Sequence, residues 1–267
     1  MTADFDTRLG ELDAGLRELG SVLVAFSGGA DSAFLLAAAV RALGTDAVVA
    51  ATAVSPSLAQ AELPAAAAFA ASLGVRHLTP GTDELSREGY VANAGDRCFH
   101  CKATLVDTLR PLAHELRLAH VATGTNADDL VAGFRPGIRA AAERGAVTPL
   151  AGLTKADVRE ASRRWGLETA DKPALACLAS RIAYGIAVTP AGLARVDAAE
   201  TALRLHLGTV VTDLRVRDLG EGVARIELDP VALTACDEAA LDVVRQSGFT
   251  TVTAQAYRSG SLNDALA

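Results

Sequence analysis

The chain has 267 residues, and half of them are hydrophobic. This length allows one large or two small domains with a sizeable buried core. The formal net charge of −7 argues against broad nucleic-acid binding, which needs clustered Lys and Arg, so we expect a small anionic substrate. We find no apolar run long enough to cross a bilayer and no signal pattern at the N-terminus, and we expect a soluble, cytoplasmic protein that binds no membrane.

The first half of the chain alternates predicted helices and strands. Apolar side chains at helical spacing predict a helix over 3–19. Strands are predicted at 22–26, 46–54, 75–79 and 119–123, and helices at 31–43, at 58–73 and from the RCFHCK stretch to about 116. This alternation predicts an α/β fold with a doubly wound, mostly parallel sheet, whose ligand crevice lies at the carboxyl ends of the strands.

The turn after the first strand carries the sequence SGGADS. Such a turn leaves amide N–H groups unpaired at the positive end of a helix dipole, which favours a phosphate. It lacks the lysine and spacing of a Walker A loop, and a glycine turn used only for packing is the alternative. The motif resembles the pyrophosphate loop of the ATP pyrophosphatase superfamily, which holds ATP by its β and γ phosphates. The predicted nucleotide-binding residues are Ser27, Gly28, Gly29, Asp31 and Ser32.

Two later polar stretches carry further candidate ligands. GTNADD, at 124–129, follows a predicted buried strand and adds Gly124 and Asp128 to the nucleotide site. Its acidic pair, Asp128 and Asp129, would bind Mg²⁺ beside phosphate oxygens or would cap the next helix. Residues 80–97 are polar and predict an irregular stretch, and RCFHCK, at 97–102, contains a Cys-x-x-Cys pair.

The stretch DKPALACLASRIAYG, which begins at Asp171, narrows the resemblance to one family. Pro173 ends regular structure, so Cys177 should lie on or beside a loop. Together with SGGADS, RCFHCK, GTNADD and LRVRDLGEGVARIEL, this stretch resembles the LarE family of ATP-dependent pyridinium-3,5-biscarboxylic acid mononucleotide sulfurtransferases over most of the chain. The CLASR element is the most specific part.

The resemblance implies a fold of the adenine nucleotide alpha hydrolase-like type and a role in making the nickel-pincer nucleotide cofactor. The substrate carboxylates would be adenylylated with ATP and Mg²⁺ and then converted to thiocarboxylates. The resemblance also implies a homo-oligomer, a hexamer. Lys102, Ser180 and Arg181 are expected to support the reaction, and the positive charges of Lys172 and Arg181 would favour the Cys177 thiolate.

The source of the sulfur is open between two mechanisms. Cys177 would give up its own sulfur and become dehydroalanine, or Cys98, Cys101 and Cys177 would hold a 4Fe-4S cluster whose open iron carries sulfide. A zinc site with His100, a redox dithiol and a structural pair are other readings of the Cys-x-x-Cys motif. An inert thiol is the alternative for Cys177.

The chain changes character after residue 186. A helix is predicted over 190–207, followed by strands at 210–217 and 223–228, a helix at 231–247 and a strand at 249–253. This order predicts a small α+β C-terminal domain over 186–267, beside a nucleotide-binding domain over 1–185. Cys236, away from every motif, is interpreted as a core thiol.

Charged residues of the second domain are candidates for binding the substrate. Arg215 and Arg217 are two apart on a strand, so they share one face, and the resemblance places a substrate phosphate there. Glu200 and Glu227 would orient substrate or bind metal. A solvated charged face is the alternative for all four residues. Two other functions also stay open: another synthetase or tRNA thiolase of the superfamily, and a non-catalytic nucleotide or metal sensor.

Overall fold

The computed structural model describes residues 2–173, 176–258 and 260–262. By its contacts the chain divides into two compact units. The first comprises Met1–Ser55, Ala61–Glu84 and Cys98–Leu175, and the second comprises Pro56–Gln60, Leu85–Arg97 and Ala176–Ala267. The division into domains 1–185 and 186–267 stays a prediction. No helix within the described ranges is long and apolar enough to span a membrane.

The first unit is built on a parallel four-stranded sheet. Its strands run in the order β3 (Arg76–Leu78), β2 (Val48–Ala51), β1 (Val22–Ala25) and β4 (His120–Ala122). Val22 pairs with Val48 on one side and with His120 on the other. The prediction of a mixed α/β fold with a parallel sheet is confirmed.

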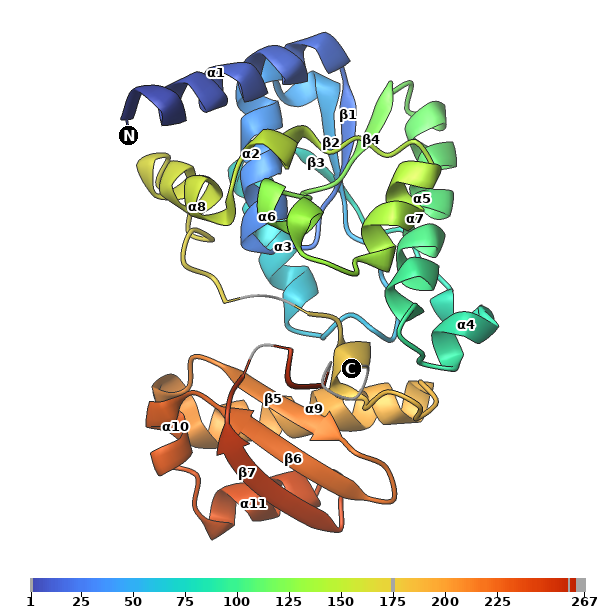
Figure 1. The fold of residues 1–267 in the computed structure, drawn as a ribbon, viewed down its shortest axis with the longest axis vertical. Coiled ribbons are helices and arrows are strands. Elements are labelled where there is room, and N and C mark those ends of the chain that lie inside the picture. The colour runs from blue at the N-terminus through green and yellow to red at the C-terminus, as the bar shows by residue number, and fades with distance from the viewer. Residues whose placement is uncertain (1, 174–175, 259, 263–267) are drawn as a thin grey trace. The chain divides into compact units, whose positions relative to one another are not determined.

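Helices cover both faces of this sheet because β1 is apolar on both. Val22 and Val24 pack in a core with side chains of α1 (Thr2–Leu19), α2 (Ala30–Leu43) and α8 (Lys155–Arg164). Leu23, which points to the opposite face, packs with Leu109 of α5 (Arg97–Glu115). Figure 1 shows α2 and α5 on opposite sides of the strands.

Several predicted boundaries in the first unit shift by a few residues. β2 starts at Val48 because Thr45–Ala47 forms a 3₁₀ turn, η1. The helix predicted from residue 58 begins at Glu62, so Pro64 lies in its first turn, where a proline costs no hydrogen bond. The remaining elements of this unit and of the stretch before α5 are α3 (Glu62–Ser72), η2 (Glu84–Ser86), α4 (Glu88–Val91), α6 (Ala127–Val131), α7 (Pro136–Glu143) and η3 (Pro149–Gly152).

The second unit contains a three-stranded sheet in the order β5 (Leu214–Asp218), β6 (Val223–Leu228) and β7 (Thr251–Ala256). β5 and β6 are antiparallel, and β6 and β7 are parallel. Its helices and 3₁₀ turns are η4 (Leu178–Arg181), α9 (Pro190–Leu207), η5 (Gly208–Val210), α10 (Pro230–Thr234) and α11 (Glu238–Arg245). The single helix predicted over 231–247 is wrong, because Asp237 caps a new helix by accepting from the Ala240 N–H at 3.0 Å.

Residues 85–97 are more regular than the sequence indicates. They form the short helix α4, and the side chain of Tyr90 is fully buried. Asn93 is also fully buried, and its side-chain amide donates to the carbonyls of Ala183 (2.8 Å) and Ile186 (2.9 Å). This segment therefore packs as part of the second unit, although its polar sequence predicts an irregular loop.

Candidate functional site

The glycine loop lies where the order of strands reverses. The chain passes from β1 outward to β2 and β3, and then returns to place β4 on the other side of β1. In open α/β sheets the crevice at such a reversal binds ligands, at the carboxyl ends of the strands. The segments that leave β1 and β4 there are SGGADS and GTNADD, so the sheet brings these two predicted motifs to one edge.

Hydroxyl groups and glycines shape the first of these loops. Gly28 adopts a φ of +74°, which favours glycine, and Gly29 precedes the first residue of α2. Ser32 Oγ donates to the Gly29 carbonyl at 3.1 Å and lies 3.1 Å from Ser27 Oγ. The first amides of α2 have no intrahelical partner by helix geometry, so the loop presents N–H donors, and the two serine hydroxyls hold its shape.

The second loop lies directly against the first. A Cβ added to Gly124 would lie 3.0 Å from the Ser32 amide nitrogen and 3.1 Å from the Asp31 carbonyl carbon. Only a glycine allows the backbone after β4 to approach the first turn of α2 this closely. Gly124, Asp31 and Ser32 are thus brought together, as the sequence predicts for one site.

The acidic pair contacts cations and an amide of neighbouring helices. Asn126, not the pair, caps α6 by accepting from the Asp129 N–H at 3.0 Å. Asp128 accepts from the first amide of α8, that of Lys155, at 2.8 Å. Asp129 lies 3.4 Å from Lys155 Nζ and 3.5 Å from Arg135 Nη2. The capping alternative is therefore wrong for α6, and the magnesium role stays a prediction.

Charge and burial act together on Asp31. Burial raises the pKa of this carboxyl, and the positive charge of Lys155 opposes the rise while the negative charge of Asp129 adds to it. A nearby cation would stabilise the ionised carboxylate of Asp31, because its positive charge opposes the effect of burial. The side-chain amide of Asn126 lies beside this carboxyl and also opposes the rise of its pKa.

The Cys-x-x-Cys pair opens the long helix α5. Cys98 is exposed and Cys101 is half-buried, one turn further along the helix, and Lys102 is half-buried beside it. A Cβ on Gly137 would lie 3.1 Å from the Cys98 carbonyl oxygen, so the start of α7 lies close to the start of α5. Within the described ranges, no group of three or more His, Cys, Asp or Glu side chains is placed to hold a metal ion.

Cys177 is exposed in the second unit, directly before η4, which agrees with its predicted place beside a loop. Ala174 and Leu175 of the same predicted motif lie outside the described residues. The Leu178 amide donates to the Ser57 carbonyl at 2.9 Å, and the Ser180 amide donates to the Cys177 carbonyl at 2.9 Å. Arg181 Nη1 donates to the Ala176 carbonyl at 2.7 Å. These hydrogen bonds fix the backbone on both sides of Cys177.

A connected network joins the other predicted residues of the second unit. Arg181 donates to Glu200 through Nε (2.8 Å) and Nη2 (3.0 Å), and Glu200 also accepts from the Val216 amide at 2.9 Å. Arg217 donates to the Ser180 carbonyl at 2.9 Å. The alternative of a solvated charged face is wrong, because all four residues for which it was open are buried: Glu200, Arg215, Arg217 and Glu227.

Arg215 and Arg217 differ in their surroundings. Burial lowers the pKa of Arg215, and the like charge of Arg181 lowers it further. Its guanidinium lies 5.5 Å from the ring centre of Tyr257. Arg217 instead pairs with Glu227 at 2.8 Å, and this carboxylate is fully buried and also accepts from Ser261 Oγ at 2.7 Å.

Sequence reasoning missed the part played by Asn93 and Arg97. Arg97 Nη1 donates to Asn93 Oδ1 and, at 2.9 Å, to the Ala179 carbonyl, so residues of the 85–97 segment hold η4 beside Cys177. Arg97 begins the RCFHCK motif, but no local pattern marks Asn93 or the contact between the two residues. Cys236, expected in the core, is only half-buried, and burial followed by the charge of Asp237 raises its pKa.

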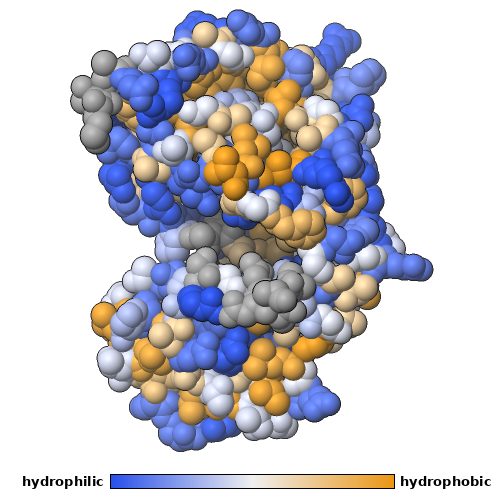
Figure 2. All heavy atoms as spheres, viewed as in Figure 1, coloured by the Kyte–Doolittle hydropathy of each residue, from blue (hydrophilic) through white to orange (hydrophobic). Residues whose placement is uncertain are grey.

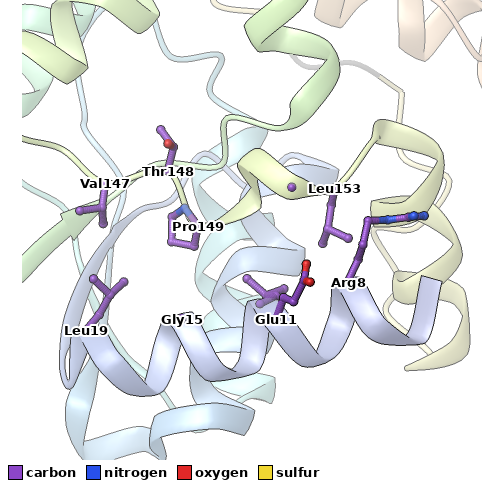
Figure 3. A pocket seen from close by; sticks show the side chains of 10 residues that line it. Arg8, Glu11, Gly15, Leu19, Val147, Thr148, Pro149 and Leu153 are labelled. Carbon is purple, nitrogen blue, oxygen red and sulfur yellow. The ribbon is translucent and has the colours of Figure 1, made fainter. Parts of the chain in front are cut away.

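A hollow of about 310 Å³ lies elsewhere in the first unit, beside α1. Figure 3 shows Arg8, Glu11 and Leu19 from α1 facing Val147, Pro149 and Leu153 across it. None of the predicted site residues lines this hollow.

Exposed apolar side chains follow the acidic pair of the second loop. They are Leu130, Val131 and Phe134, and Val131 is 83% exposed. Figure 2 shows apolar side chains gathered on this face of the first unit. Exposed apolar surface of this kind is typical of a region that contacts another molecule.

The parallel sheet and the two loops at its reversal define a mixed α/β protein that is compatible with a Rossmann-like nucleotide-binding fold. The chain matches no family model. It is 42% identical over 270 residues to an uncharacterized protein of Synechocystis sp., covering 98% of each chain. It is 32% identical over 271 residues to the pyridinium-3,5-bisthiocarboxylic acid mononucleotide synthase of Lactiplantibacillus plantarum, covering 99% of this chain and 96% of that protein. The chain therefore belongs to the LarE family.

Proposed function

We propose that this chain is an ATP-dependent sulfur-inserting enzyme of nickel-pincer nucleotide cofactor biosynthesis. It would convert the carboxylates of pyridinium-3,5-biscarboxylic acid mononucleotide to thiocarboxylates. The near full-length similarity to the Lactiplantibacillus plantarum synthase carries the proposal. The glycine loop at the strand reversal supports the nucleotide-binding part of it.

The proposed reaction has two steps because a carboxylate oxygen is a poor leaving group. A carboxylate oxygen attacks the α-phosphorus of ATP, and the bond from that phosphorus to pyrophosphate breaks. A sulfur nucleophile then attacks the acyl carbon, and AMP leaves with the electron pair of the broken bond. Ser27, Gly28, Gly29 and Ser32 would bind the β and γ phosphates, Gly124 would shape the loop, and Asp31 and Asp128 would hold Mg²⁺.

In the second unit, Arg215 and Arg217 are the proposed site for the substrate phosphate. Guanidinium groups suit phosphate because their N–H donors form a planar fork. Glu200 positions Arg181 through two hydrogen bonds, and Ser180 accepts from Arg217 through its carbonyl. These residues would orient the substrate rather than react with it.

Two sulfur sources remain in the proposal, and both use Cys177, whose side chain is exposed. Thiols are suitable ligands for an iron–sulfur cluster, and Cys98 and Cys101 lie one turn apart at the start of α5. Cys98, Cys101 and Cys177 would hold a 4Fe-4S cluster, which when bound would supply sulfide. The alternative is that the Cys177 thiolate itself attacks the adenylate and loses its sulfur.

The test is a product assay with the full chain, ATP, Mg²⁺ and the biscarboxylated mononucleotide. We expect AMP and pyrophosphate to be released and sulfur to replace oxygen in the product, as read by mass spectrometry. Cys177→Ala should still release pyrophosphate as the acyl adenylate forms, but it should form no thiocarboxylate and should release AMP only as fast as water hydrolyses the adenylate. AMP released with tRNA and not with the mononucleotide would instead support a tRNA thiolase, and ATP binding without any AMP would support a sensor.

A further inference from the structure

The segment after α8 reaches back to the glycine loop. Arg159 of α8 donates to the carbonyls of Ala170 (2.8 Å) and Lys172 (3.0 Å), which fixes the backbone there. The Lys172 side chain then extends to the loop, where Nζ lies 3.1 Å from the Gly28 carbonyl oxygen. All of these residues belong to the first unit.

The same ammonium group has one acidic partner. Lys172 Nζ lies 3.0 Å from Glu62 Oε2, in the first turn of α3, and the two side chains are 24% and 23% exposed. Partial burial makes such a pair stronger than one on the open surface. Gly28 also packs against α3, since a Cβ added at Gly28 would lie 3.4 Å from the Cβ of Ala66.

This arrangement supplies a charge that the loop's own sequence lacks. SGGADS contains no lysine, and the whole chain has only three. An ammonium group has three donors, and its flexible four-carbon stem lets it follow a phosphate oxygen as a point charge. Glu62 competes for the same ammonium and repels phosphate.

We propose that Lys172 binds the phosphates of a nucleotide held in the glycine loop, with Glu62 as its resting counter-ion. The inference rests on the proposed function, because it needs ATP in that loop. When the triphosphate binds, its oxygens take the place of the Glu62 carboxylate at Lys172 Nζ. Removing the lysine therefore weakens binding, whereas neutralising the glutamate strengthens it.

The experiment measures binding to the full chain by calorimetry, with ATP, ADP and adenosine as the probes. Lys172→Gln should raise the Kd for ATP about tenfold or more, raise that for ADP less, and leave that for adenosine unchanged. Lys172→Arg, which keeps the charge, should restore most of the ATP affinity. Glu62→Gln should lower the Kd for ATP. Arg110→Gln, on the exposed side of α5, is the charge-matched control and should bind all three probes as wild type does.

The outcomes separate this inference from the function beneath it. A wild-type chain that binds no ATP would overturn both. A wild-type chain that binds ATP, beside a folded Lys172→Gln that binds it equally well, would overturn the role of Lys172 alone. Equal loss of ATP and adenosine in Lys172→Gln would show that the lysine only shapes the loop. Circular dichroism of each variant confirms the fold before binding is compared.

Discussion

Asp31 joins the electrostatics of the glycine loop to the stability of the chain. Burial raises the pKa of its carboxyl above the usual value of 3.8, so the folded chain keeps a proton in a pH range where the unfolded chain has lost it. The stability that Asp31 contributes therefore falls as the pH rises through this range, and the penalty persists at neutral pH. A cation at the loop would reduce this penalty by favouring the carboxylate.

We predict that Asp31→Asn is more stable than wild type at about pH 7, and that the difference shrinks towards zero below about pH 4. Urea unfolding at a series of pH values measures it. Asp171→Asn is the matched control, because the hydrogen bond from Arg163 lowers the pKa of that exposed carboxyl, so the control should gain no stability at neutral pH. An Asp31→Asn variant less stable than wild type at neutral pH would contradict the prediction.

At the scale of elements, the contact between the loop after β4 and the start of α2 fixes the geometry of the candidate nucleotide site. The atoms nearest to a Cβ on Gly124 all belong to the backbone of Asp31 and Ser32, so no side chain can move to make room. Any larger residue must push the two loops apart. The distance between the loops is therefore set by a single glycine.

Gly124→Ala should lower the free energy of unfolding by about 1–3 kcal/mol, the usual cost of forcing a methyl group into a packed site. It should also weaken ATP binding, because the first amides of α2 move. Gly152→Ala is the control, since a Cβ at Gly152 meets nothing within 4 Å. Denaturant unfolding and calorimetry on both variants measure the two effects, and equal behaviour of the two variants would show that the contact is not tight.

Local sequence patterns predicted the helices correctly where a single strong signal, such as a capping residue, marks where the helix begins. The helix predicted over 190–207 is α9, whose first residue is Pro190 and whose N-cap, Thr189, accepts from the Gly192 amide. The helix predicted over 231–247 was wrong because apolar spacing continues through Asp237, whose side chain caps a second helix.

The residues of the candidate site also differ in whether local sequence could predict their surroundings. The glycine loop is local, and its residues are close in sequence. The burial of Arg217 depends on Glu227 and Ser261, which lie 10 and 44 residues away along the chain, so spacing could place it on a face but could not show that the face is covered. Glu62, the partner of Lys172, lies 110 residues from it and carries no motif.

At the scale of the whole molecule, the net charge bears on the class of substrate, and the cysteines bear on the source of the sulfur. The net charge of −7 disfavours broad nucleic-acid binding, so we expect the small nucleotide substrate that we propose. The cluster proposal needs the thiols of three residues, Cys98, Cys101 and Cys177. The sacrificial alternative needs only the thiol of Cys177.

This difference makes iron content a test of the sulfur source. If the cluster proposal holds, the full chain reconstituted without oxygen should contain about four iron and four sulfide per chain, and Cys98→Ala should lose them. Cys236→Ala is the matched control and should keep them, because burial disfavours the thiolate of Cys236 that a metal would need. If wild type and Cys98→Ala both lack iron, Cys177 is the sulfur donor. Each chain should then yield no more than one thiocarboxylate, and the spent protein should lose the mass of hydrogen sulfide as Cys177 becomes dehydroalanine.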